Sequence, residues 1–244
     1  MSVAILTYHS LDDNGSVISV APRVFAAQMD SLAKAGIRVV PLDEVPRLLD
    51  SGESAVAITF DDGFRNLRDY AAPVLARHRF PATVFLVAAH CGRNNGWDTQ
   101  PTDVARQPLL DWDEIKVLHA AGMRFGAHSR SHPVLTQLPA AAAEAEMVDS
   151  KQAIEAELGE PVDTFAYPYG ACNMRTRQLA RRHFRIACGV RLGYAGQNSD
   201  RLELERLDMY YFRHQPDLGN LFAPRTRFYV AVRAALRAAR RLLA

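Results

Sequence analysis

The sequence contains the stretch AVAITFDDGF at residues 55–64. Its opening residues are mostly apolar and do not alternate with polar ones, which is typical of a strand that is buried on both faces. Similar runs recur along the chain, and stretches with helix-like spacing lie between them. We therefore expect strands at Val3–Tyr8, Ile37–Val40, Ala55–Phe60, Ala82–Val87, Met123–Ala127, Thr164–Tyr167 and Phe184–Val190. The intervening stretches predict helices at Pro22–Ala35, Leu42–Ser51, Arg65–His78, Asp113–Ala121, Pro139–Leu158 and Met174–His183.

This alternation of strands and helices predicts an α/β protein, because parallel strands need crossover connections and helices usually supply them. The chain has 244 residues, 48% of them hydrophobic, which is enough for one large domain with a substantial core. Neither a linker-like stretch nor an internal repeat divides the sequence. We therefore expect a single domain.

The positive charge is concentrated at one end of the chain. The formal net charge is +2, and residues 223–244 contain six arginines and no acidic residue. Removing those six charges leaves about −4 on the remainder. A mildly acidic body of this kind argues against a general nucleic-acid binder.

The three cysteines, Cys91, Cys172 and Cys188, are scattered and show no Cys-x-x-Cys spacing. They predict neither a zinc ribbon nor a disulfide framework. The first residues lack the basic region and the long apolar run of a signal peptide, and no apolar run reaches membrane-spanning length. We expect a reduced, cytoplasmic protein.

Two adjacent carboxylates, Asp61 and Asp62, follow the strand predicted at Ala55–Phe60 and precede Gly63. Adjacent carboxylates repel each other unless a cation or a proton lies between them. One interpretation is therefore that one aspartate binds a metal ion and the other acts as a base. The alternative is a turn that leads into a helix, because Asp-Asp-Gly also supplies that geometry. Taken alone, the motif favours the turn.

Two histidines, His128 and His132, directly follow the strand predicted at Met123–Ala127. At this spacing they can project from one face of a helical turn and form part of a zinc site. A polar loop that ends at Pro133 is the alternative. The double aspartate favours the metal site, because the carboxyl ends of parallel strands share one face. Two histidines and one aspartate would leave coordination positions open for water and substrate.

Other polar and aromatic residues also follow predicted strands. His9 could act as a general acid or base, or be a hydrogen-bonded structural residue. The stretch FAYPYG at 165–170 has aromatic side chains whose faces suit sugar rings, and one of its backbone N–H groups could bind an oxyanion. The alternative is a core strand that ends in a turn, which is compatible with the same residues. Trp97 and Trp112 are candidates to line a groove, although Trp112 could instead pack at the start of a helix. The long loop predicted at Ala89–Leu110 is of a kind that is usually functional or disordered.

Taken in order, these motifs resemble those of the polysaccharide deacetylase (NodB-homology) family, carbohydrate esterase family 4, over about residues 3–206. The resemblance implies an incomplete (β/α)7 barrel in residues 1–212. Residues 213–244 would then form a basic, amphipathic helical extension.

The resemblance also implies roles for individual residues. Asp61 would be the catalytic base, and Asp62, His128 and His132 would bind the metal ion. The backbone N–H of Tyr169 would contribute to an oxyanion hole. The cofactor would be a divalent metal ion, with Zn²⁺ as the expected ion.

The sequence departs from the family pattern in two places. Many members have an arginine that orients the catalytic aspartate, and Ala166 occupies the nearest position here. Many also have a late Leu-x-His motif that supplies the acid, and the surroundings of His214 do not match it. The Tyr-His element at residues 8–9 resembles a subgroup of exopolysaccharide-modifying deacetylases with circularly permuted motifs, which assigns His9 as the general acid. Arg206 is the candidate for the missing arginine. The candidates for substrate contact are Tyr167, Pro168, Trp112 and Arg206.

The implied function is metal-dependent removal of N-acetyl groups from a saccharide or glycoconjugate that contains N-acetylhexosamine. Hydrolysis of an O-acetyl ester or of another amide needs the same groups, so these alternatives stay open. An inactive carbohydrate-binding homologue is a third alternative, and the intact set of metal ligands argues against it.

The C-terminal stretch Phe228–Ala244 predicts an amphipathic helix. Its arginines at 233, 237, 240 and 241 share one face, opposite an apolar face. Such a helix can lie on an anionic membrane, which would favour a lipid-linked sugar as substrate and a position on the cytoplasmic membrane face. Alternatively, the helix packs on the barrel and shows its arginines to solvent. The second arrangement is the preferred expectation.

Overall fold

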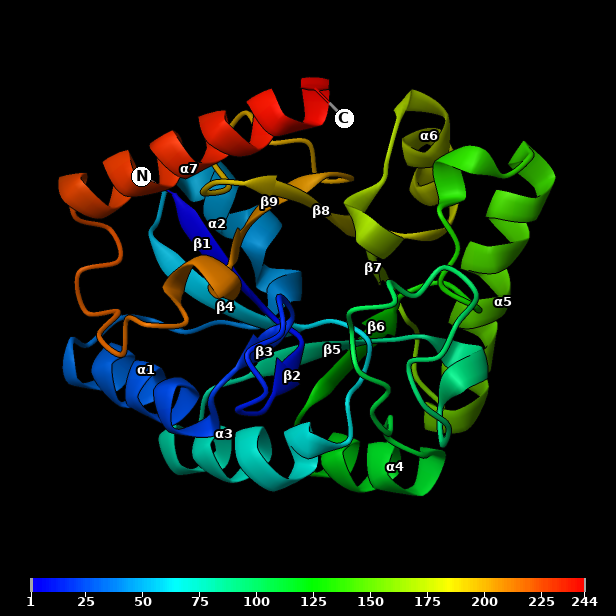
Figure 1. The fold of residues 1–244 in the computed structure, drawn as a ribbon, viewed down its shortest axis with the longest axis horizontal. Coiled ribbons are helices and arrows are strands. Elements are labelled where there is room, and N and C mark those ends of the chain that lie inside the picture. The colour runs from blue at the N-terminus through cyan, green and yellow to red at the C-terminus, as the bar shows by residue number, and fades with distance from the viewer. Residues whose placement is uncertain (1, 244) are drawn as a thin grey trace.

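A computed structural model describes the backbone of residues 2–243 and the side chains of residues 2–240. Its centre is a closed barrel of seven parallel strands (Figure 1). Around the ring these are β1 (Val3–Tyr8), β4 (Ala55–Phe60), β5 (Ala82–Leu86), β6 (Arg124–Ala127), β7 (Thr164–Ala166), β8 (Ile186–Leu192) and β9 (Leu204–Asp208). The last strand pairs with the first through Leu6 with Leu207 and Thr7 with Asp208. The expected (β/α)7 barrel is confirmed, and the pairing of β1 with β9 closes it.

Helices surround the barrel, in the positions that the sequence predicts. They are α1 (Pro22–Lys34), α2 (Val45–Ser51), α3 (Ala72–His78), α4 (Trp112–Ala120), α5 (Ala140–Leu158), α6 (Met174–His183) and α7 (Pro224–Leu243). Two short strands, β2 (Ser10–Leu11) and β3 (Ser19–Val20), pair with each other outside the barrel. Short helical turns occur at Leu42–Glu44, Leu67–Ala71, Ala88–His90, Leu135–Gln137, Pro168–Gly170 and Met209–Phe212. Gly36 and Gly122 have φ angles of +64° and +96° just beyond α1 and α4, where the sequence predicts helix ends.

One predicted strand was wrong. Ile37–Val40 forms only an isolated bridge between Val39 and Val56, because β5 occupies that edge of β4 from Ile58 onward. Barrel strand β9 and the short strands β2 and β3 were not predicted. The charged residues Glu205 and Arg206 interrupt the apolar pattern of β9, and Arg206 turns out to be buried.

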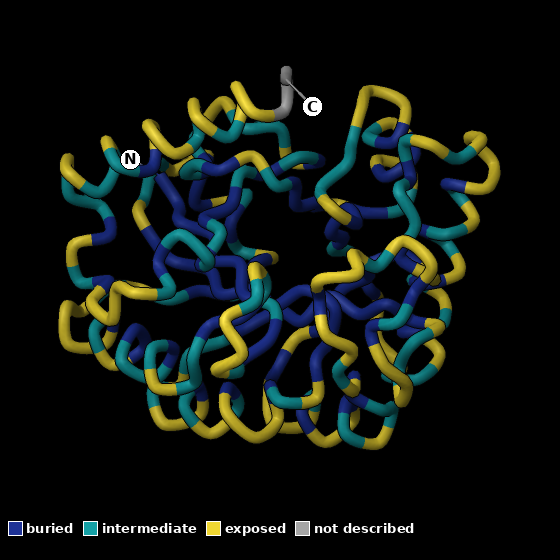
Figure 2. The backbone as a smooth tube through the Cα atoms, viewed as in Figure 1, coloured by how far each residue is buried: buried dark blue, intermediate teal, exposed yellow. Residues whose placement is uncertain are grey.

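The barrel strands consist mostly of buried residues (Figure 2), and most of these residues are apolar. Ala4 and Leu6 of β1 belong to the larger hydrophobic cluster that includes the surrounding helices. Val3 and Ile5 belong to a second cluster, with Ala57 and other residues of the barrel interior. Burial on both sides explains why these strands show no simple apolar-polar alternation in the sequence.

Helix α7 packs on the barrel, as the preferred expectation has it. Val230 is buried and Ala234 is partly buried against the core, whereas Phe228, Val232 and Leu236 are exposed. The helix therefore packs on the barrel through a side other than the apolar face identified in the sequence, and Arg233 and Arg240 are exposed. The predicted faces also include Arg241, Leu242 and Leu243, whose side chains lie outside the described residues. No helix of the described chain combines the length and the apolar character needed to cross a membrane.

Candidate active site

The carboxyl ends of the barrel strands surround a cavity of about 210 Å³. Asp61 and Asp62 follow β4, His128 follows β6, and His9 follows β1. These residues and His132 all line the cavity. The shared location at strand ends, predicted from the sequence, is confirmed, because all seven strands of the barrel run parallel.

The three predicted metal ligands, Asp62, His128 and His132, lie close together. Nε2 of His128 lies 3.2 Å from Nε2 of His132, and each of these nitrogens lies 3.4 Å from Oδ1 of Asp62. Ligand atoms at 2.0–2.1 Å from a tetrahedral zinc ion would be about 3.3–3.4 Å apart. The three side chains are buried, and their donor atoms can hold a metal ion.

The segment that carries the two histidines is a loop, so the predicted helical turn was wrong. Ser129 and His132 have φ angles of 65° and 63°, in the left-handed region, which a continuing helix excludes. The Ser129 hydroxyl accepts a hydrogen bond of 2.9 Å from the N–H of His132. Ser131 donates to the Glu146 carboxylate of α5 through its N–H and its hydroxyl. These contacts hold a strained loop whose shape brings both imidazole rings to the cavity.

Hydrogen bonding and burial set the state of each imidazole. Nδ1 of His128 lies 2.7 Å from the carbonyl oxygen of Ala166, so a proton on Nδ1 leaves Nε2 free to bind a cation. Burial opposes a charge on His128, but the hydrogen bond with Asp62 and the charge of Asp61 raise its pKa overall. Burial lowers the pKa of His132 to about 3, so this ring is neutral at physiological pH. Metal binding would displace any proton from Nε2 of His128.

Asp61 makes a buried, two-pronged ion pair with Arg206. Nη1 and Nη2 of Arg206 donate to Oδ1 and Oδ2 of Asp61, each at 2.7 Å. The guanidinium also donates through Nε to the Gly189 carbonyl at 3.0 Å. Burial would raise the pKa of Asp61, but the charge of Arg206, the charge of His128 and the hydrogen bonds from Arg206 together outweigh it and hold the pKa far below its usual range. Asp61 is therefore a carboxylate of fixed orientation.

His9 faces the other side of this carboxylate. Its Nε2 lies 3.8 Å from Oδ2 of Asp61, and a quarter of the side chain is exposed. The ring also lines the cavity, so His9 is open to a bound molecule while it stays close to the ion pair. This placement is compatible with proton transfer to a substrate atom in the cavity.

An aromatic wall forms the opposite side of the cavity. Tyr169 has a φ of 56°, and its ring lies edge-on to His132 with the centroids 4.6 Å apart. The Trp97 ring lies 4.2 Å from His132, and its Nε1 donates to the Tyr169 hydroxyl at 3.0 Å. Thr99 donates to the His132 carbonyl at 2.9 Å, and its own carbonyl accepts from Tyr169 at 2.9 Å. The long loop between β5 and α4 is thus tied to the site.

The other predicted contact residues lie in different environments. Tyr167 borders the cavity, but it is buried and its hydroxyl donates to the Leu202 carbonyl at 2.8 Å. Pro168 is buried beside it. Arg206 reaches Asp61 and is not among the residues that line the cavity. Trp112 is not brought to the cavity and forms the first residue of α4.

Several cavity residues carried no chemical signal in the sequence. The apolar side chains of Val17, Ile18, Val104 and Val190 line its walls. Val17 and Ile18 lie before β3, in a segment for which the sequence predicts neither helix nor strand. For Val104, the length of the loop at 89–110 was the only available signal.

The family profile for polysaccharide deacetylases matches residues 49–184, which is more than half of the chain. The chain belongs to the polysaccharide deacetylase family. The matched range includes Asp61, Asp62, His128, His132 and Tyr169. His9 and Arg206 lie outside it: His9 directly follows the first strand of the barrel, and Arg206 lies on the last.

Individual relatives agree with this membership. The chain is 26% identical over 182 residues to YxkH of Bacillus subtilis, covering 73% of this chain and 60% of that protein. It is 29% identical over 141 residues to a chitooligosaccharide deacetylase of Rhizobium leguminosarum bv. trifolii, covering 57% of this chain and 56% of the relative. The chain thus spans less than two thirds of the length of either. The structure of the deacetylase PplD of Streptococcus pyogenes matches with a TM-score of 0.74 at 25% identity, covering 85% of this chain and 92% of that one.

Proposed function

We propose that this protein is a metal-dependent hydrolase that removes acetyl groups from N-acetylated saccharides. One observation carries the proposal: a cluster that can bind a metal ion, Asp62 with His128 and His132, shares a cavity with a carboxylate fixed by Arg206. A metal site with an adjacent oriented carboxylate is suited to hydrolysis of an amide by water. Membership of the polysaccharide deacetylase family supports an acetylated saccharide as the substrate.

We assign Asp62, His128 and His132 as ligands and zinc as the native ion. Two imidazole nitrogens and one carboxylate oxygen form a donor set that zinc enzymes commonly use, and the separations of 3.2–3.4 Å suit tetrahedral coordination. An ion held there would polarise an amide carbonyl and make a bound water molecule more acidic.

The remaining groups would act on protons and charge. Asp61, oriented by Arg206, would take a proton from the water molecule that adds to the acetyl carbon. The backbone N–H of Tyr169 would donate a hydrogen bond to the oxyanion that forms. His9 would give a proton to the nitrogen as the carbon–nitrogen bond breaks, so that acetate and a free amino sugar result.

The size of the cavity supports recognition of a small group on a larger molecule. Its volume of about 210 Å³ lies below the roughly 300–1,000 Å³ of pockets that enclose whole ligands. We therefore infer that the acetamido group and part of one sugar ring enter, while the rest of the saccharide stays outside. Both a free oligosaccharide and a lipid-linked saccharide fit this description.

Metal analysis and acetate release test the assignment together. Purified protein should contain close to one equivalent of zinc and should release acetate from N-acetylhexosamine oligosaccharides. Asp61→Asn should keep the metal and lose at least about a hundredfold in rate, the lower end of the range for a general base. His128→Ala should lose both metal and activity.

His119→Ala is the matched control, because that histidine lies on α4 and does not line the cavity. It should keep both metal and activity. If Asp61→Asn deacetylated these substrates at the rate of the wild-type enzyme, the proposed role of Asp61 would be wrong. If no metal-loaded preparation released acetate from any N-acetylated saccharide, the proposed function would be wrong.

A further inference from the structure

The outward face of α7 is apolar along its described length. Phe228, Val232 and Leu236 have exposed fractions of 72%, 41% and 51%. Residues four apart lie above one another on a helix, so these side chains form one stripe. Exposed alanines at positions 231, 235 and 239 widen that stripe. We call Phe228, Val232 and Leu236, with these alanines, the α7 stripe.

The barrel does not need the α7 stripe for its own packing. Val230 is the buried residue of the inner side, and Tyr229 and Ala234 pack beside it. The Tyr229 hydroxyl donates to the Tyr211 carbonyl at 2.9 Å, which fixes the rotation of the helix. The helix is thus anchored with its apolar stripe exposed. Figure 2 shows exposed residues along α7, at the edge of the molecule.

Two further contacts anchor α7 along its length. Arg227 donates to the Ser2 hydroxyl at 2.7 Å, next to the start of β1. Arg237 lies 3.5 Å from a carboxylate oxygen of Asp208, at the end of β9. The helix therefore extends from the amino end of the barrel to the end where the site lies, and the stripe is presented on a rigid support.

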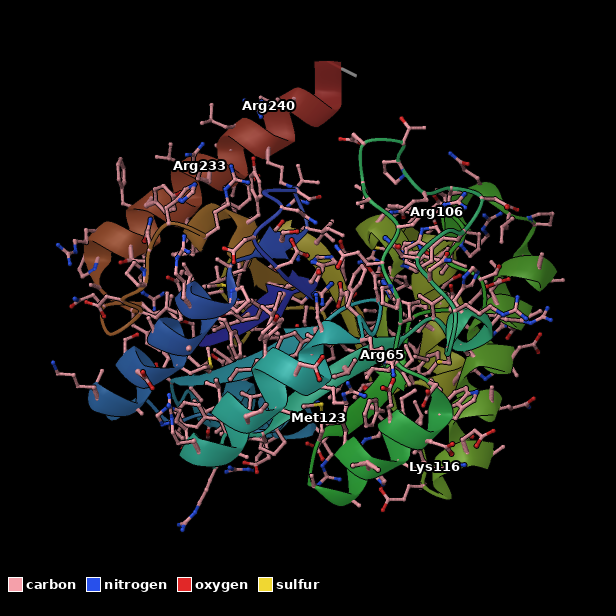
Figure 3. All side chains as sticks on the ribbon, turned by 60° about the horizontal axis from the view of Figure 1, so that its bottom comes forward. Arg65, Arg106, Lys116, Met123, Arg233 and Arg240 are labelled. Atoms are coloured by element: carbon pink, nitrogen blue, oxygen red, sulfur yellow. The ribbon has the colours of Figure 1, made fainter. Side chains whose placement is uncertain are left out.

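Exposed positive charge flanks the stripe. Arg225, Arg233 and Arg240 are exposed, and among the described side chains no carboxylate forms an ion pair with them. Figure 3 shows Arg233 and Arg240 on α7, at the outer edge of the molecule. The Arg233 guanidinium lies over the rings of Tyr211 and Tyr229, 5.6 and 5.4 Å from their centroids, which holds it at the side of the helix. The last acidic residue of the sequence is Asp217.

We propose that the α7 stripe and its flanking arginines bind the surface of an anionic membrane. A lipid interface accepts both parts of this face, because the apolar side chains enter the acyl boundary and the guanidinium groups remain at the phosphates. A second copy of the chain would bring two sets of arginines together, which Coulomb repulsion opposes. A nucleic acid would neutralise the arginines but leave the apolar side chains in water.

Vesicle sedimentation tests this proposal with the intact protein. Vesicles of phosphatidylcholine with phosphatidylglycerol should pellet the protein, and vesicles of phosphatidylcholine alone should pellet much less. The double variant F228S/L236S should bind about tenfold more weakly or worse, because two exposed apolar side chains no longer enter the interface. Arg225→Glu with Arg240→Glu should weaken binding to the anionic vesicles, and added salt should weaken wild-type binding.

Matched control variants test whether vesicle binding depends on α7 or on exposed apolar and charged residues in general. Val117→Ser removes a side chain of α4 that is 68% exposed, and Arg181→Glu reverses an exposed charge on α6. Both should bind vesicles like the wild type. All variants change exposed residues, so their melting temperatures should stay close to the wild-type value.

Membrane binding and the proposed hydrolase activity can be tested separately. F228S/L236S should deacetylate a soluble N-acetylated oligosaccharide at the wild-type rate, since the substitutions are outside the cavity. The membrane proposal would be overturned if the wild type did not pellet with anionic vesicles. It would also be overturned if the controls lost binding as much as the α7 variants did, or if the stripe variants only dissociated a dimer.

Discussion

Replacing Arg206 by methionine should cost far more stability than replacing an exposed arginine. Methionine fills a similar volume but leaves the Asp61 carboxylate buried without its partner. Removing one member of a buried ion pair costs about 3–5 kcal/mol, and in a chain of this size each kcal/mol lowers the melting temperature by roughly 2–4 °C. We therefore expect Arg206→Met to melt roughly 6–20 °C below the wild type.

The assay is thermal unfolding with chelator present, so that metal binding does not contribute. Arg201→Met is the matched control, because Arg201 pairs with Asp50 through both carboxylate oxygens at 2.7 Å and both side chains are about half exposed. An exposed pair of this kind contributes about 0–1 kcal/mol. The control should therefore shift the melting temperature by no more than about 4 °C.

A double-mutant cycle isolates the pair itself. Asp61→Asn and Arg206→Met should each destabilise the protein, and the double variant should be more stable than the sum of the two costs predicts. Additive costs, or a melting temperature for Arg206→Met within about 2 °C of the wild type, would refute the argument that this ion pair is buried and coupled.

The same pair gives a pH dependence with a defined sign. In the wild type the pKa of Asp61 is held low, so its contribution to stability is present above the unfolded pKa and is lost as the pH falls through the folded value. In Arg206→Met, burial without a partner should raise the pKa of Asp61 and penalise its ionised form. The stability gap between the two proteins should therefore widen as the pH rises from about 4 to about 7. A gap that narrowed over this range would contradict the assignment.

Three further predictions concern packing, metal binding and thiol chemistry. Gly170→Ala should destabilise the protein by about 1–3 kcal/mol, because the added Cβ would lie 2.1–2.4 Å from atoms of Val190 and the residue has a φ of +59°. Gly196→Ala is the control and should be nearly neutral, because no atom lies within 4 Å of its added Cβ. Equal melting temperatures for the two variants would contradict this prediction. Zinc at a hundredfold excess over its dissociation constant should stabilise the wild type against unfolding by about 2.7 kcal/mol. The same zinc concentration should not stabilise His128→Ala. Equal stabilisation of both proteins would contradict the assignment of His128 as a metal ligand. Burial raises the pKa of the Cys188 thiol to about 12, so a thiol reagent should modify this residue only on unfolding, and rapid labelling of the native protein would contradict its burial.

The sequence was sufficient to predict the metal cluster because its signals are local. The Asp61-Asp62 pair and His128 follow barrel strands, and parallel strands bring such ends together. The spacing of His128 and His132 indicated shared ligation, although the backbone between them is a strained loop and not a helical turn. The sequence thus predicted that the side chains of Asp62, His128 and His132 come together, even though it did not predict the local conformation.

Features that depend on long-range packing were harder to predict. A sequence does not distinguish a buried arginine from a surface arginine. The strand β9 was therefore not predicted, because Arg206 interrupts its apolar pattern, and Arg206 was only a candidate partner for Asp61. The loop around Trp97 was identified by its length, but nothing in its residues indicates that it would reach His132 and Tyr169. The rotation of α7 depended on the barrel surface beneath it, and an amphipathic pattern alone does not indicate which face is turned inward.

Closure of the barrel by β9 also affects when the site can form during synthesis. Asp61 and Arg206 are 145 positions apart in the sequence. At about 5–20 residues per second, a ribosome needs roughly 7–29 seconds to produce the arginine after the aspartate has been added. Contacts between such distant residues also slow folding, since a long loop must close before they form. The nascent chain therefore carries an uncompensated carboxylate until its last barrel strand is available, and the oriented carboxylate of Asp61 is a late product of folding.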